Sequence, residues 1–166
     1  GNPLTLSGFL FDITERKQAE LTRRNQQVEL NQILAALPEA LVYSDPDRLI
    51  ARVNPAFTRV FGYSPQLAIG RKTEILYARP EDFADQGRRR FNRDAENQNA
   101  PYEIEMRRQD GTCFPSETVG TPVRDSDGQV VGYLGLVRDL TGRRAVETKS
   151  EILMNRLKLA TKVAGI

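Results

Sequence analysis

The two ends of the chain differ from its middle in how hydrophobic and polar positions alternate. Residues 15–37 and 141–163 are rich in charged helix formers, and their apolar side chains return at helical intervals. Both stretches are therefore predicted to be long helices. The middle instead alternates short apolar runs with Asp-Pro, Asp-Gly and Gly-Tyr-Ser-Pro turns, which indicates a mixed α+β domain.

Apolar residues recur every seven positions in both predicted helices. They are Leu21, Val28 and Ala35 in the first helix, and Val146, Leu153 and Ala160 in the second, where Leu157 supports the row. This spacing is typical of a loosely packed parallel coiled coil, so the two helices are predicted to be connectors that pair in a homodimer. The alternative is an amphipathic helix that lies on its own domain.

The middle of the chain is predicted to form one five-stranded antiparallel sheet with helices over one face. Asn54-Pro55 and Ser64-Pro65 each set a capping residue before a proline, the favoured start of a helix, and Pro80 opens a third helix. Two strands, a run of short helices and a three-stranded meander give this α+β architecture. The expected strands are 40–44, 49–53, 102–108, a strand that follows the turn at 109–112, and 130–136.

One short segment occurs twice. Residues 12–17, Asp-Ile-Thr-Glu-Arg-Lys, are similar to residues 139–144, Asp-Leu-Thr-Gly-Arg-Arg, and each copy follows an apolar stretch and precedes a charged helix. Each is predicted to be a strand that leaves a sheet and turns into a helix, with Asp or Thr as the N-cap. The two copies start 127 residues apart (139 − 12), which is about the length of one domain plus a connector. The parent protein is therefore predicted to carry tandem units. The expected organisation is the end of a preceding unit at 1–13, a helical connector at 14–37, a complete domain at 38–141, a second connector at 142–160 and the start of a following unit at 161–166.

Four motifs in this order resemble a PAS domain. They are Asn54-Pro55-Ala56-Phe57, Phe61-Gly62-Tyr63-Ser64, the strand-turn-strand of 103–114 through Asp110-Gly111, and the ending Arg138-Asp139-Leu140-Thr141. The resemblance covers residues 38–141. It implies a PAS fold with strand order 2-1-5-4-3, helices that enclose a cavity against one face of the sheet, and linker helices at both ends.

The resemblance also implies a role. PAS domains serve as sensors and dimerisation units in histidine kinases, diguanylate cyclases, phosphodiesterases, chemoreceptors and transcription regulators. This fragment is accordingly expected to be a non-enzymatic signal-relay and dimerisation module of a two-component or cyclic-di-GMP signalling protein, which controls a downstream output domain through its C-terminal helix. The alternatives are a sensor that holds a small molecule or a non-covalent flavin in the cavity, and a small α+β enzyme.

The composition narrows these functions. The chain has no histidine, which excludes histidine-based nucleophiles, histidine-ligated haem and the common zinc sites, so no metal site is expected. A net charge of +2 does not indicate nucleic acid as a partner, and no apolar run is long enough to insert into a membrane. The single cysteine, Cys113, fits a cytoplasmic protein without disulfides.

A cysteine-linked flavin is also not expected. The PAS members that bind flavin covalently carry their cysteine in the helical segment, and the corresponding residues 73–78 contain none. Cys113 is predicted to be an ordinary strand residue. The arginine run at 88–93 is predicted to be a solvated helix face, because five acidic residues nearby balance its charge.

Two groups of candidate site residues follow. The first group would line the cavity of a PAS fold. The alternative is that the same residues fill a closed core. They are Asn54, Phe57, Phe61, Leu76, Met106, Val119 and Leu134.

The second group lies where the sheet passes into the C-terminal helix. In this family such an ending transmits changes in the sheet, so Asp139, Thr141 and Arg143 are the signal-coupling candidates. Arg143 and Arg144 place cations in the first turn of a helix, where the dipole disfavours them, and a partner such as Asp139 or a carboxylate on the sheet is expected. The alternative is a solvated charge pair worth under about 1 kcal/mol.

Overall fold

The computed structural model describes residues 3–96 and 100–163. By its internal contacts the chain divides into two units, residues 1–37 and residues 38–166. The first unit is built on one helix, α1 (Pro3–Ala36), and the second contains the sheet and the shorter helices.

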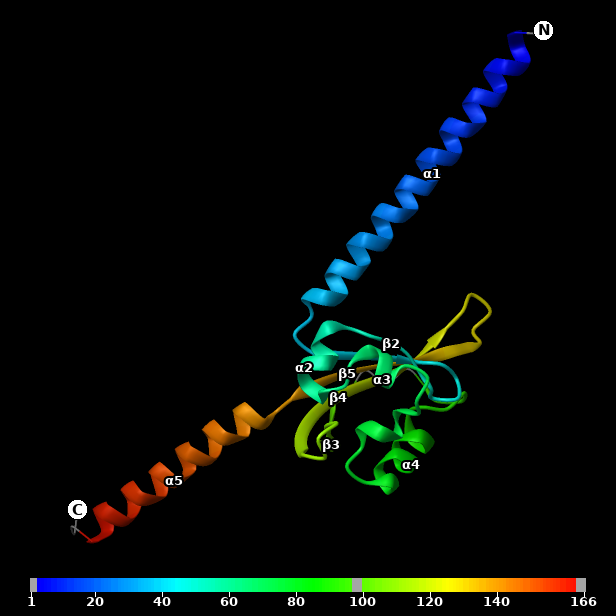
Figure 1. The fold of residues 1–166 in the computed structure, drawn as a ribbon. Helices are drawn as coiled ribbons and strands as arrows, with labels where there is room; N and C mark the ends of the chain where they lie inside the picture. Colours follow the sequence, from blue (N-terminus) through cyan, green and yellow to red (C-terminus); the bar gives the residue numbers. More distant parts are fainter. Residues whose placement is uncertain (1–2, 97–99, 164–166) are drawn as a thin grey trace. The chain divides into compact units, whose positions relative to one another are not determined.

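The second unit is organised around one antiparallel sheet, and its strand order, β2-β1-β5-β4-β3, confirms the prediction. The first strand of the unit therefore pairs with the last, with Ala40 opposite Val137 and Ser44 opposite Tyr133. Figure 1 shows β5 in the centre of the sheet. The strands are β1 (Ala40–Ser44), β2 (Ile50–Val53), β3 (Tyr102–Arg107), β4 (Cys113–Arg124) and β5 (Val130–Asp139).

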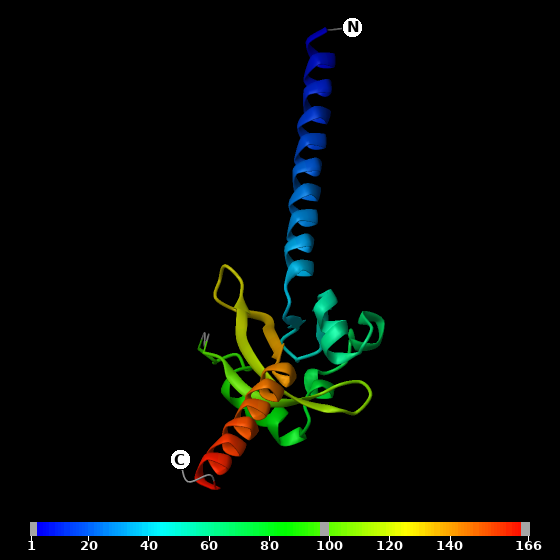
Figure 2. The same ribbon diagram turned by 90° about the vertical axis from the view of Figure 1, so that its left-hand side faces the viewer.

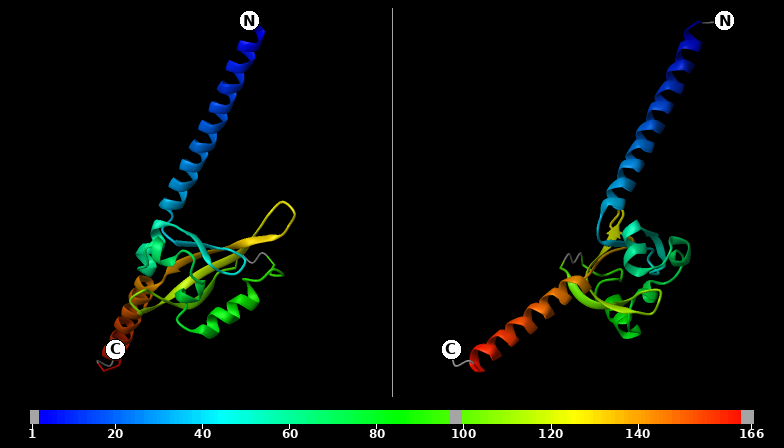
Figure 3. Two further views of the ribbon diagram at one scale, coloured as in Figure 1. Left: turned by 45° about the vertical axis from the view of Figure 1, so that its right-hand side comes forward. Right: turned by 60° about the vertical axis from the view of Figure 1, so that its left-hand side comes forward.

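Short helices join β2 to β3 and pack on one face of the sheet (Figure 3). The core between helices and sheet is built around Phe57 and Phe61 of the first helix and Phe114 of β4, which are fully or almost fully buried. Phe61 contacts both other rings at centroid distances of 5.1 and 5.6 Å. The helices are α2 (Pro55–Phe61), α3 (Pro65–Ala68), the 3-10 helix η1 (Thr73–Leu76) and α4 (Pro80–Arg89).

Asn54 fixes the start of α2, as the Asn-Pro pair predicts. Its side-chain oxygen accepts hydrogen bonds from the backbone N–H of Phe57, at 3.0 Å, and of Leu41 in β1, at 2.9 Å. Its amide nitrogen donates to the carbonyl of Glu39 at 3.0 Å. One buried side chain thus ties α2 to the first strand, and Gly62, at φ 78°, ends the helix.

Residues 8–13 differ from the prediction. The sequence indicated a strand at 8–11 and a helix that starts near Asp12, whereas α1 runs through both without a break. A strand satisfies its backbone only by pairing with neighbours, and an α-helix satisfies it within one segment, so an apolar stretch outside a sheet forms helix. The tandem arrangement of units stays a prediction, and residues 164–166 lie outside the described part of the chain.

The sheet leads directly into the C-terminal helix α5 (Thr141–Val163), with only Leu140 between β5 and α5. The backbone N–H of Leu140 donates to the carbonyl of Pro115 in β4 at 2.9 Å, which holds the junction against the sheet. Away from the junction, the β4–β5 hairpin extends beyond the other strands (Figure 2).

Replacing Asn54 by alanine is expected to lower the free energy of unfolding by about 3 kcal/mol, because α2 loses its cap and the buried N–H of Leu41 loses its acceptor. Chemical denaturation measures the change. Ser64→Ala is the matched control, since Ser64 also precedes a helix but makes no capping bond with its side chain. Equal effects of the two substitutions would contradict this role of Asn54.

Candidate functional site

A small cavity lies between the sheet and the helices. It measures ≈ 40 Å³ and is lined from β1, β3, β4, β5 and η1. Val42, Leu76, Met106 and Val137 provide apolar walls. The polar groups of the lining include Ser44, Arg48, Thr73 and Thr118.

The predicted cavity residues fall into three groups. Leu76 and Met106 line the cavity. Phe57 and Phe61 are fully buried in the core beside α2 and do not border it, so for these two the alternative of filled core describes the structure. Asn54 is buried as the cap of α2 and is likewise not part of the lining.

Val119 and Leu134 were placed on the wrong face of the sheet. Side chains alternate along a strand, and in β4 Thr118 lines the cavity while in β5 Tyr133 and Gly135 do. Their neighbours Val119 and Leu134 therefore lie on the opposite face. The error has a physical cause: residues 133–137 are apolar or glycine without a break, so no alternation marks the inward side.

Arg48 is the charged residue among the cavity-lining residues that the sequence did not reveal. The turn after β1 places it at φ 64°, and its backbone N–H donates to the carbonyl of Asp45 at 3.0 Å. Burial lowers the pKa of Arg48, although a guanidinium stays charged at neutral pH. No pattern in the sequence separates this arginine from the many exposed ones.

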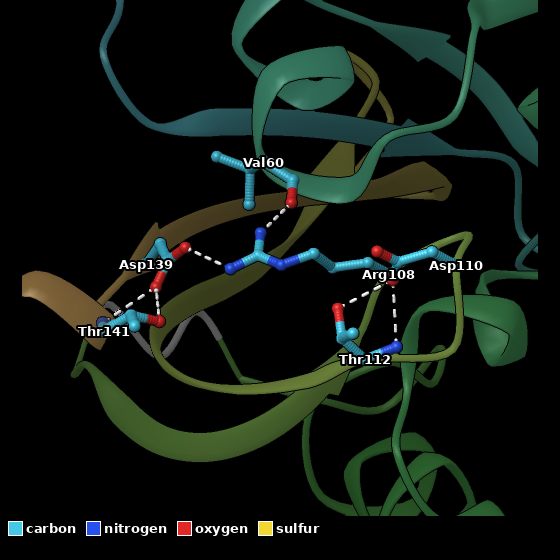
Figure 4. A network of polar contacts seen from close by, with 6 residues as sticks. All are labelled: Val60, Arg108, Asp110, Thr112, Asp139 and Thr141. Atoms are coloured by element: carbon cyan, nitrogen blue, oxygen red, sulfur yellow. Dashed lines mark hydrogen bonds and ion pairs between the residues drawn. The ribbon is translucent and has the colours of Figure 1, made fainter.

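A second polar network joins the sheet to the start of α5 (Figure 4). The Arg108 guanidinium lies 2.6 Å from a carboxylate oxygen of Asp139, and both side chains are about a quarter exposed, at 24% and 26%. The same guanidinium donates to the carbonyl of Val60 in α2. The other oxygen of Asp139 accepts from the backbone N–H of Thr141 at 2.8 Å and from its hydroxyl at 2.6 Å.

The two arginines in the first turn of α5 have different partners. Arg144 forms an ion pair with Glu103 of β3, which is the predicted carboxylate on the sheet. Arg143 instead pairs with Glu147 at 3.0 Å, an ion pair that lies within α5 and does not join the helix to the sheet. Asp139 and Thr141 are therefore part of the junction network, and Arg143 lies outside it.

The strand order and the Asp139–Thr141 junction are the features that the sequence analysis associated with PAS domains. A family model described as the PAS domain matches residues 38–142. The chain belongs to the PAS domain family. The match covers the whole sheet and ends at the start of α5.

Sensor proteins are among the relatives of this PAS domain. FixL of Bradyrhizobium diazoefficiens is 29% identical over 170 residues, which cover 100% of this chain and 33% of FixL. The C4-dicarboxylate transport sensor protein DctS of Rhodobacter capsulatus is 27% identical over 89% of this chain and 22% of DctS. The chain thus spans a third or less of these relatives.

Solved structures agree on the fold. A PAS domain from Colwellia psychrerythraea has a TM-score of 0.58 at 25% identity and covers 70% of this chain and 98% of its own. An RNA-binding Light-Oxygen-Voltage receptor has a TM-score of 0.60 at 26% identity, over 78% of this chain and 37% of its own. The protein is therefore a PAS sensory domain.

The cysteine and the arginine run of this PAS domain lie on its surface. Cys113 is exposed at the start of β4. Arg88 and Arg89 are exposed and pair with Asp85, as expected of a solvated face. Among residues 3–96 and 100–163, no group of three acidic, cysteine or histidine side chains could hold a metal ion, and no helix is long and apolar enough to cross a membrane.

Asp139 is held in its charged form. Partial burial would raise the pKa of Asp139, but the hydrogen bonds from Arg108 and Thr141 outweigh burial, and the pKa lies below its usual value. A carboxylate with a lowered pKa adds stability above the pKa of the unfolded chain, about 3.9, and loses it as the pH falls through the folded value.

Asp139→Asn is therefore expected to cost stability at pH 7 and less at pH 3, because acid removes the advantage of the wild-type carboxylate. Urea denaturation of both proteins at the two pH values measures the difference. The control is Glu151→Gln, which removes an exposed carboxylate of α5. A stability gap between wild type and Asp139→Asn that stays constant with pH would contradict the assignment.

Proposed function

We propose that this PAS domain is a signal-relay and dimerisation module that controls a downstream output domain through α5. The observation that carries the proposal is the junction network. Asp139 ends β5 and at the same time bonds to Thr141, the first residue of α5, and to Arg108 beside β3. A change in the position of Arg108 would therefore alter the hydrogen bonds at the first turn of α5.

The Arg108 side chain connects α2 to this junction. It donates to the carbonyl of Val60, while the next residue, Gln109, donates its backbone N–H to the carbonyl of Phe61 at 2.8 Å. The guanidinium also lies 4.0 Å from the ring centroid of Phe114 in the core. A shift of α2 or of Phe114 would therefore move the Arg108 side chain, which contacts Asp139 directly.

The start of the domain lies beside its end. Arg138 in β5 pairs with Glu39, just before β1, at 2.7 Å, and with Glu117 of β4 at 3.3 Å. Hydrogen bonds from Arg138 hold the pKa of Glu39 below its ordinary value. Since β1 and β5 are neighbours, a signal that arrives at Glu39 would have only one strand to cross before it reaches α5.

The output domain is proposed to be a histidine kinase, with an enzyme of cyclic-di-GMP turnover as the alternative. Support comes from the sensor proteins among the relatives and from a solved neighbour, the LOV domain of a blue-light activated histidine kinase from Erythrobacter litoralis. The fragment itself is proposed to be non-enzymatic and cytoplasmic.

The helices are proposed to mediate a homodimer. Val146 and Leu153 of α5 follow the seven-residue spacing and are 68% and 72% exposed. Leu21 and Val28 of α1 follow the same spacing and are exposed as well. Pairing with a second copy would bury such rows, as in a parallel coiled coil.

Val146→Glu combined with Leu153→Glu is expected to weaken the dimer by at least roughly tenfold, because two carboxylates per chain would face each other in the seam. Analytical ultracentrifugation of the full chain measures the change. The control, Asn155→Glu, adds a carboxylate on the opposite side of α5. If the double variant dimerises as tightly as the control, the interface lies elsewhere, for instance on the sheet.

Asp139→Ala in the full-length parent is expected to change the output activity while the domain stays folded, because the charged link between Arg108 and α5 is removed. Kinase or cyclase activity would be measured with and without the stimulus, and circular dichroism would report folding. The control is Glu151→Ala in the same parent. Output that is unchanged in Asp139→Ala would remove the coupling role.

Ligand sensing is the second candidate function, and the presence of a cavity supports it for small ligands only. At ≈ 40 Å³ the cavity is far smaller than the roughly 300 Å³ of ordinary ligand pockets. A flavin would require the lining to move outward, whereas a ligand of a few atoms would not.

A further inference from the structure

Arg48 is a buried cation that has no carboxylate partner in the part of the chain that the structure describes. The residue is only 9% exposed, and no carboxylate oxygen of the described residues lies within 4.0 Å of its guanidinium. Residues 97–99, which are not described, are Asn, Gln and Asn in the sequence, so they supply no acid. Arg108, whose side chain is 24% exposed, is by contrast paired with Asp139.

The protein satisfies this guanidinium only in part. One nitrogen donates to the carbonyl of Phe83 at 2.9 Å and the other terminal nitrogen to the hydroxyl of Tyr77 at 3.4 Å. The ring of Phe83 lies 3.7 Å from the guanidinium carbon. A guanidinium has five N–H donors, so donors remain for another acceptor. Burial of a charge without an opposite charge is costly, and an anion would offset that cost.

Arg48 also borders the cavity. Arg48 and Thr73 both line it, and the backbone N–H of Thr73 donates to the carbonyl of Arg48 at 2.9 Å, so the two residues are neighbours. The hydroxyl oxygen of Thr73 is buried and has no hydrogen-bond partner among the described residues. One cavity is therefore lined by a residue with a buried charged donor and by a residue with a buried hydroxyl that lacks a partner.

The size and the remaining walls of the cavity limit what it can hold. A volume of ≈ 40 Å³ corresponds to about three water molecules, or to a ligand of about four non-hydrogen atoms. Leu76 and Met106 provide apolar surface for the rest of such a molecule. Phe91 also borders the space, and it packs so tightly on β4 that a Cβ at Gly120 would lie 2.3 Å from its ring.

We propose that this cavity binds a small monocarboxylate of about two or three carbons, with its carboxylate on Arg48 and Thr73 and its alkyl end against Leu76 and Met106. A carboxylate matches the planar fork of a guanidinium and accepts two hydrogen bonds from it. This inference goes beyond the proposed relay role and can fail while that role stands, since it concerns the content of the cavity and not the junction.

Titration of the full 166-residue chain tests the proposal. Formate, acetate, propionate and butyrate would be added to dialysed protein at pH 7.5, and the side-chain Nε–H signal of Arg48 would be followed by NMR. We expect a saturable shift that is strongest for acetate or propionate and absent for acetamide and propionamide. No saturable shift with any carboxylate, or equal shifts with the amides, would overturn the proposal. Binding of nitrate as tight as that of acetate would also overturn it, because the site would then select charge alone.

Three variants assign the binding to residues. Arg48→Met keeps the length of the side chain without its charge and should weaken acetate binding by roughly 10- to 100-fold. Thr73→Val is nearly isosteric and should weaken it by roughly 2- to 10-fold, which keeps the test open if Arg48→Met fails to fold. Arg59→Met, at an exposed arginine of α2, is the control and should bind like the wild type. Unchanged affinity in Thr73→Val and Arg48→Met would place the ligand elsewhere. Dimerisation and output of the parent are measured separately, so a failure here is distinct from a failure of the relay role.

Discussion

The pairing of the first strand of the domain with the last is the constraint on which the rest of the structure depends. β1 is hydrogen-bonded to β5 over its whole length, although more than half of the domain lies between them in the sequence. This pairing closes the helices of residues 55–89 over one face of the sheet and so encloses the core and the cavity. It also places Glu39, where the chain enters the domain, next to Arg138, where it leaves. Pairing residues so far apart in sequence costs loop-closure entropy, which the packing of the core must offset.

The cavity and the junction meet at the end of one strand. Met106 lines the cavity from β3, and Arg108, just after the end of β3, holds Asp139. Arg108 also reaches α2, where it donates to the carbonyl of Val60. Across the hairpin, Phe114 is opposite Met106 and lies against the guanidinium of Arg108. Side chains in contact therefore connect the cavity to Asp139 at the start of α5.

The sequence was sufficient for features that depend on local chemistry. The helix starts at Asn54-Pro55 and Pro80 and the turn at Asp110-Gly111 were predicted because each rests on the backbone preferences of two or three residues. Features that depend on the assembled sheet were not predictable in this way. The apolar run of β5 carries no alternation, so Leu134 was assigned to the wrong face, and an arginine such as Arg48 gives no sign of burial in its neighbours. The strand order followed from the family resemblance and not from the pattern of residues.

Asp139 bonds to α5 and to Arg108 at the same time, so the position of Arg108 and the start of α5 depend on one side chain. One oxygen bonds to the N–H and the hydroxyl of Thr141 at the start of α5, and the other bonds to Arg108. The cations Arg143 and Arg144 in the same turn oppose the helix dipole, so the first turn of α5 relies on its contacts with the sheet. Each of these contacts is partly exposed and worth about 1 kcal/mol, which is within the 1 to 3 kcal/mol that coupling between two sites typically involves. In the proposed relay role, a stimulus would only need to favour one position of Arg108 over another by an amount of that size to alter the contacts at the start of α5.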